Sequence, residues 1–131
     1  MSNDVHIISI ALGDPGADDV QLFAFEAPAV GDGGGVTVVA AHVVDSAATS
    51  GTVGWAVALH TYSNAATPLL NGTIAAAVGG TTDHWAADVP KDFSVTDTYV
   101  SAGEQVVLQY DETNAGNPTN AIVNIHYKMG K

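Results

Sequence analysis

The chain of 131 residues carries 14 acidic residues against three lysines, contains neither arginine nor cysteine, and has a formal net charge of −11 at pH 7. Because nucleic-acid binding needs Lys and Arg to neutralise phosphates, this charge disfavours DNA and RNA as partners, and it disfavours anionic membrane surfaces for the same reason. The lack of cysteine excludes disulfides, thiolate metal sites and cysteine nucleophiles.

The length fits one domain with its own core, and no linker, repeat or shift of composition divides the chain. We therefore predict a single β-sandwich domain over residues 1–131. The start, Met1-Ser2-Asn3-Asp4, is acidic, whereas a secretory signal begins with basic residues. No apolar run approaches the about 20 residues that span a bilayer. The protein is therefore expected to be made in a cytoplasm without a signal to leave it.

Apolar stretches rich in β-branched and aromatic residues alternate along the chain with clusters of Gly, Pro, Asn, Asp and Ser. In chain order these stretches are Val5–Leu12, Val20–Phe25, Val36–Val44, Val53–Tyr62, Thr73–Val78, Trp85–Val89, Val106–Tyr110 and Ala121–Tyr127. Short strands at this spacing are typical of a sandwich or a barrel, and no convincing amphipathic helix interrupts them. We predict an all-β fold, an antiparallel β-sandwich of jelly-roll type with about eight strands.

Two turn clusters carry further expectations. The sequence Asn71-Gly72-Thr73 matches a glycosylation sequon but is better explained as a hairpin turn. The glycines at 33–35 indicate a loop, and because they have no side chains they would let another chain approach closely.

The stretch Val53–Tyr62 predicts one buried face and one face available to a partner. One set of alternate positions holds the large residues Val53, Trp55, Val57 and Leu59, and the other holds Gly54, Ala56, Ala58 and His60. Since alternate residues of a strand point to opposite sides, the large set should form the core. The small set is the predicted oligomer interface; simple exposure of this face to solvent is an equally open alternative.

The search for reactive or metal-binding residues gives only weak candidates. The five histidines, His6, His42, His60, His84 and His126, show no H-x-H or H-E-x-x-H spacing. They are better explained as local hydrogen-bonding residues whose titration can make an assembly sensitive to pH. Two oxygen-rich loops, one with Asp14, Asp18 and Asp19 and one with Asp111, Glu112 and Asn114, are able in principle to hold calcium. Neither has EF-hand spacing, and solvated loops are the simpler interpretation.

Catalytic motifs are also missing. Glu26 and Glu104 are possible members of a carboxylate pair, but nothing in the sequence brings them together. There is no G-x-S-x-G element, and the loop Gly31–Gly35 lacks the lysine of a phosphate loop. We therefore expect no enzyme activity, no cofactor and no metal. Trp55 should lie in the core. For Trp85, beside a turn, packing in the core or in an interface is the favoured interpretation, and partial exposure, which suits stacking on a sugar, is the alternative.

The C-terminal third runs from Asp92 to Tyr110 through the turn Ala102-Gly103-Glu104, then through a polar loop to the stretch Ala121–Tyr127. This succession of strand, turn, strand, loop and terminal strand resembles small β-sandwich accessory proteins of tailed-phage virions. They include head decoration (cement) proteins and the bases of head or tail fibres.

The resemblance implies a non-enzymatic bacteriophage structural protein on the capsid surface. It would form a homo-oligomer, commonly a trimer, and bind the major capsid protein or another virion protein. A carbohydrate-binding or receptor-binding module of a fibre or a secreted complex is the alternative.

Overall fold

The computed structural model describes residues 4–29, 34–49, 54–63, 70–80, 83–113 and 116–131, and its regular structure in these ranges is entirely β. The strands are β1 (His6–Ala11), β2 (Val20–Glu26), β3 (Val36–Val44), β4 (Gly54–Tyr62), β5 (Leu70–Gly79), β6 (Lys91–Asp92), β7 (Thr98–Val100), β8 (Gln105–Thr113) and β9 (Ile122–Met129).

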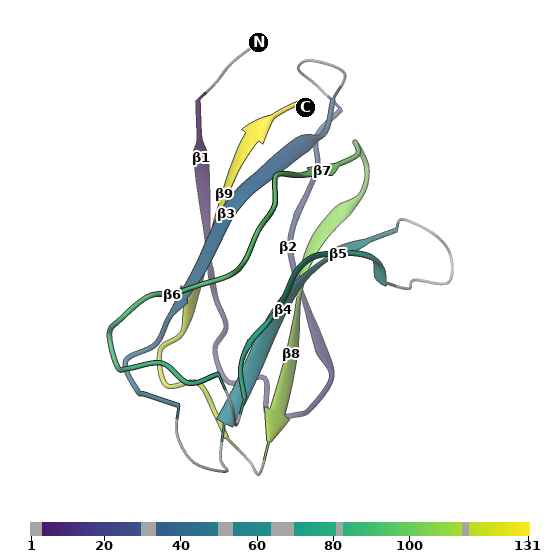
Figure 1. Ribbon diagram of the computed structural model, residues 1–131. Helices are drawn as coiled ribbons and strands as arrows, with labels where there is room; N and C mark the ends of the chain where they lie inside the picture. Colours follow the sequence, from purple (N-terminus) through teal and green to yellow (C-terminus); the bar gives the residue numbers. More distant parts are fainter. Residues whose placement is uncertain (1–3, 30–33, 50–53, 64–69, 81–82, 114–115) are drawn as a thin grey trace.

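The strands form two antiparallel sheets (Figure 1). Sheet I has the order β1-β9-β3-β6, with β7 also paired to β3, and sheet II has the order β2-β8-β4-β5. The pairs are nested along the chain, because β1 pairs with β9, β2 with β8, β3 with β6 and β7, and β4 with β5. A long hairpin of this kind, wrapped over itself, is the jelly roll. The predicted all-β sandwich of jelly-roll type is confirmed.

β6 and β7 together occupy the place of one strand of the eight-stranded pattern. Both pair with β3, at opposite ends of that strand: Asp92 faces His42, and Val100 faces Val36. The segment between them, residues 93–97, is not paired as a strand. Seven of the eight predicted stretches are strands, and the short β6 and β7, which were not predicted, bring the number in the described ranges to nine.

Two local predictions were wrong. Trp85–Val89 is not a strand: the chain turns there, with Asp88 at a positive φ of 60°, a conformation that ends extended structure. Asn71-Gly72-Thr73 is not a turn, because it lies inside β5. The pairing of β5 with β4 shifts its register three times, so the glycine there belongs to an irregular strand rather than to a hairpin loop.

The core lies between the sheets and follows the alternation expected for β4. Trp55, Val57 and Leu59 are buried, while Val53 lies outside the described residues. The Trp55 ring packs edge-on against Trp85 at 4.8 Å between ring centres and stacks on Tyr110 at 5.9 Å. The buried apolar residues on the inner faces of the two sheets form one cluster, and their removal from water stabilises the fold at roughly 25 cal/mol per Å².

Candidate functional site: the outer faces of the two sheets

The four residues of the predicted oligomer interface lie on the outer face of sheet II, on the side of β4 opposite the core. Gly54 and Ala58 are buried within the single chain, and Ala56 and His60 are half-buried. A methyl group on Gly54 would lie 2.7 Å from the Gly80 carbonyl oxygen, so this glycine is needed for close packing inside the subunit. The role of the four residues in oligomer contacts stays a prediction.

An apolar cluster, formed by the aromatic pair Phe23 and Tyr62 together with Val107, lies on the same outer face. Phe23 packs edge-on against Tyr62 at 4.9 Å between ring centres and is 55% exposed. Val107 of β8 is paired with Phe23 on one side and with His60 on the other, and it is fully buried although it faces away from the core. Sheet II therefore has a small apolar centre on its outside, next to the predicted interface.

The outer face of sheet I carries a row of hydrogen-bonded polar side chains across three strands. Ser9 of β1 donates to the Asn124 side-chain oxygen at 2.5 Å, and the Asn124 amide nitrogen lies 3.1 Å from Nε2 of His42 on β3. Asn124 separates the serine from the histidine, so this row is not a nucleophile–base pair. The His126 ring lies 5.6 Å from the His42 ring.

The two acidic loops that were considered separately come together at one end of sheet II. Asp18 accepts a hydrogen bond from the Glu112 amide at 3.0 Å, and Asp19 accepts one from the Gln109 side chain. Burial, and then the negative charge of Asp18, raise the pKa of the Asp111 carboxyl. Asn114 lies outside the described residues. No group of three or more His, Asp or Glu in the described ranges has an arrangement that would hold a metal ion.

Tyr110 lies at the border between this acidic cluster and the core. Its hydroxyl donates to Glu112 at 3.0 Å and lies 3.3 Å from the Gly116 carbonyl oxygen. Burial, and then the bond to Glu112, raise the pKa of Tyr110 strongly. The phenol therefore stays protonated near neutral pH and acts as a structural hydrogen-bond donor.

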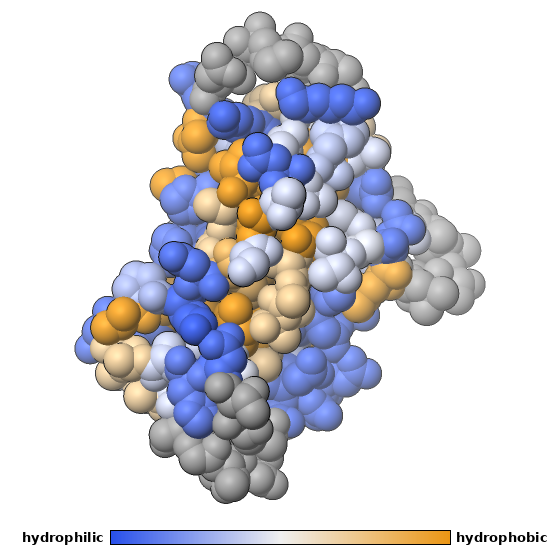
Figure 2. Space-filling model, viewed as in Figure 1, coloured by the Kyte–Doolittle hydropathy of each residue, from blue (hydrophilic) through white to orange (hydrophobic). Residues whose placement is uncertain are grey.

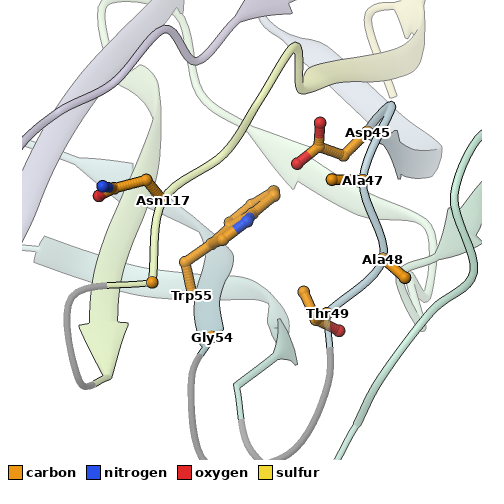
Figure 3. Close-up of a pocket in the computed structure, with 8 residues that line it drawn as sticks. Asp45, Ala47, Ala48, Thr49, Gly54, Trp55 and Asn117 are labelled. Atoms are coloured by element: carbon orange, nitrogen blue, oxygen red, sulfur yellow. The ribbon is translucent and has the colours of Figure 1, made fainter.

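A cavity of about 140 Å³ lies beside the core tryptophan Trp55 and is lined by Asp45, Ala47, Ala48, Thr49, Gly54, Trp55, Gly116 and Asn117. Figure 3 shows the Trp55 ring between Asp45 and Asn117. The polar groups of this cavity already have partners: the Asp45 carboxylate accepts from the Asn120 amide at 2.8 Å, and the Thr49 hydroxyl accepts from the Trp85 amide at 3.2 Å. These bonds hold loops to the sandwich.

Trp85 is only 6% exposed and belongs to the core cluster, so the favoured interpretation of packing is confirmed and the alternative of partial exposure is wrong. It packs against Trp55 because the chain turns inward after β5 instead of forming a surface strand. Its indole nitrogen is buried and has no hydrogen-bond partner among the described residues. Neither tryptophan offers a face for sugar stacking.

The remaining candidates have structural partners. Glu26 and Glu104 do come close in the fold, since the Ala27 amide donates to the Glu104 carbonyl oxygen at 2.8 Å, but the Glu104 side chain accepts from Asn71 at 2.8 Å. In the glycine loop, Gly34 and Gly35 are buried, and Tyr99 of β7 donates to the Gly34 carbonyl oxygen at 2.9 Å. The chain that approaches these glycines is therefore the protein's own β7. Gly31–Gly33 lie outside the described residues.

Comparison of the chain with protein-family models, with curated proteins and with solved structures finds no match. In the ranges that the structure describes there is no helix long and apolar enough to cross a bilayer.

Proposed function

We propose that this chain is a non-enzymatic virion structural protein of a bacteriophage, a decoration (cement) protein on the head surface that binds the major capsid protein or another virion protein. The jelly-roll topology supports the proposal because viral capsid domains use this fold, although lectins and cupins use it as well. Because proteins with the same fold can have many different functions, the evidence for this function has to come from the surface of the protein.

The observation that carries it is the exposure of large apolar side chains on the outer faces of both sheets. Phe23 on sheet II is 55% exposed, and Ile7 on sheet I is 60% exposed. With only three lysines in a chain of charge −11, ion pairs are few, and exposed pairs contribute about 0–1 kcal/mol each. Contacts between subunits must therefore rest on apolar burial, at roughly 25 cal/mol per Å². Formation of a homotrimer through the face of Gly54, Ala56, Ala58 and His60 is part of the same proposal.

Co-sedimentation with preformed tailed-phage capsids, beside a glycan array, tests the proposal. The protein is expected to pellet with capsids and to bind no glycan. Phe23→Lys should weaken capsid binding, whereas Val89→Lys, at a residue of similar exposure (51%) outside the strands, should not. Glycan binding by a monomer that ignores capsids would contradict the proposal.

The same array examines the alternative, a carbohydrate-binding or receptor-binding module. The burial of Trp85 removes the sugar platform that the sequence left open as an alternative. The Phe23–Tyr62 pair is the aromatic surface that favours this alternative, because an exposed ring is able to stack on a sugar. A glycan binder of this kind should lose its binding with Phe23→Ala.

A further inference from the structure

Strand β1 forms an open edge of sheet I. Among the described residues β9 is its only paired neighbour, and this pairing runs from His6 to Ala11 without a register shift. In Figure 1 β1 lies at the margin of the sandwich, and Figure 2 shows hydrophobic residues reaching the surface along that margin.

The register identifies the main-chain groups on this open side. The Leu12 amide donates to the Ala121 carbonyl oxygen at 3.0 Å, in line with the β1–β9 register. In an antiparallel pair, every second residue exchanges both of its main-chain bonds with the partner strand. The even-numbered residues of β1 therefore bond to β9, and the amides and carbonyls of the odd-numbered residues, such as Ile7 and Ser9, point toward the open side.

The other edges carry the features that natural proteins use to block strand addition, which are charges, bulges and short length. β2 has a register shift between Phe23 and Phe25 and ends on Glu26, and β5 has three register shifts. β6 and β7 have two and three residues. β1 has none of these features: its sequence HIISIA contains no proline and no Lys, Asp or Glu.

The distribution of charge favours a second copy of the same chain at this edge. Strands β1, β9 and β3 contain no Asp or Glu, although the chain has 14 acidic residues. Two such subunits repel each other in most orientations. A contact along β1 instead brings together the carboxylate-free strands of both copies, and the exposed side chains of Val5 and Ile7 lie beside it.

We propose that β1 pairs in antiparallel fashion with β1 of a second copy across a two-fold axis, joining two copies of sheet I into one continuous sheet. The inference rests on the proposed function only in requiring self-association, and it is independent of the trimer contact on sheet II. In a two-fold strand pair residues of the same parity face each other, so the open groups of Ile7 and Ser9 meet open groups of the second copy. The axis then passes at Ile7, Ile8 or Ser9.

Sedimentation velocity tests this contact with Ile7→Lys, which places a charge on the edge. The assembly of the unaltered chain should have about twice the mass of the Ile7→Lys assembly, since a two-fold contact joins equal units. Val89→Lys, with the same change of charge at a similarly exposed residue, should leave the mass unchanged. Circular dichroism checks that both variants fold. An unaltered mass for folded Ile7→Lys, or a monomeric unaltered chain at every concentration, would overturn the proposal.

The lack of cysteine allows a second, independent measurement. Ile7→Cys, Ile8→Cys and Ser9→Cys, made one at a time, place the only thiol at each possible position of the axis. Under mild oxidation one of the three should form a covalent dimer, and this variant identifies the register; Val89→Cys should not. The absence of a dimer in all three would contradict the β1 contact.

The capsid experiment separates this contact from the proposed function. If Ile7→Lys still pellets with capsids, the proposed function does not depend on the β1 contact. If the unaltered chain forms the dimer but does not bind capsids, only the proposed function is wrong.

Discussion

At the scale of single residues, the surroundings of a side chain decide its role here more than its type does. Asp18 and Asp45 both accept hydrogen bonds from main-chain amides. These carboxylates therefore hold loops against the sandwich and have a structural role. Asp111 differs, because burial and the neighbouring charge of Asp18 disfavour its ionised form. Because the charged form of Asp111 is unfavourable in the folded protein, the ionisation of this residue should make the stability of the fold depend on pH.

We predict that Asp111→Asn stabilises the protein at neutral pH. Since the pKa of Asp111 is raised in the folded state, the ionised carboxylate destabilises the fold above that pKa. The cost disappears as the pH falls through the folded-state pKa toward the ordinary value of 3.8. The gain in the free energy of unfolding over the unaltered chain should therefore be present at pH 7 and vanish in acid, as urea denaturation across pH would measure. The exposed Asp97→Asn is the control with the same change of charge, and an equal gain there would contradict the explanation.

At the scale of elements, glycines determine how strands end and how closely loops pack. Gly79 closes β5 with a φ of 103°, and a side chain there would collide with the main-chain carbonyl oxygen of Trp55 and lie 2.7 Å from the Trp85 ring. Gly103, in the turn before β8, has a φ of 87° and no atom within 4 Å of the position of a side chain. The first glycine is required by conformation and by space, and the second by conformation alone.

Gly103→Ala should therefore lower the free energy of unfolding by about 1–2 kcal/mol, the cost of a left-handed conformation for an L-residue. Gly79→Ala should cost more, because the Trp55 main chain and the Trp85 ring must also move. Chemical denaturation of the two variants measures the difference. Gly72→Ala, at a glycine without positive φ, serves as reference and should have a smaller effect. Equal losses for Gly79→Ala and Gly103→Ala would show that the packing of Trp55 and Trp85 around Gly79 is not tight.

At the scale of the whole molecule, a charge of −11 and apolar outer faces act in opposite directions on assembly. We predict that added salt strengthens self-association, because screening removes repulsion between subunits while apolar burial is kept. The Debye length falls from about 30 Å at 0.01 M to about 10 Å at 0.1 M ionic strength. Light scattering over this salt range should show the mass rising. Dissociation with rising salt would mean that ionic contacts hold the subunits together.

The sequence by itself determined the local structure. The alternation in β4 assigned Trp55, Val57 and Leu59 to the core, because side chains of a strand point to alternate sides, and β3 was predicted with the bounds that the structure has. The alternation of apolar residues is a local pattern, so it can be recognised from a single sequence. The predicted strand Trp85–Val89 was wrong because the chain turns there, which buries Trp85 and leaves Ala86, Ala87 and Val89 exposed.

Only the tertiary structure decided which distant segments meet. β1 and β9 pair across more than a hundred residues, as Ser9 and Asn124 do, and no local pattern specifies such a partner. The pairing of β2 with β8 brought the two acidic loops together, and the strand order of sheet I left β1 open on one side. The packing of sheet II covered Gly54 and Ala58 of the predicted interface. Which strands pair with each other depends on the apolar burial and the register of the whole sandwich. No single stretch of sequence contains this information.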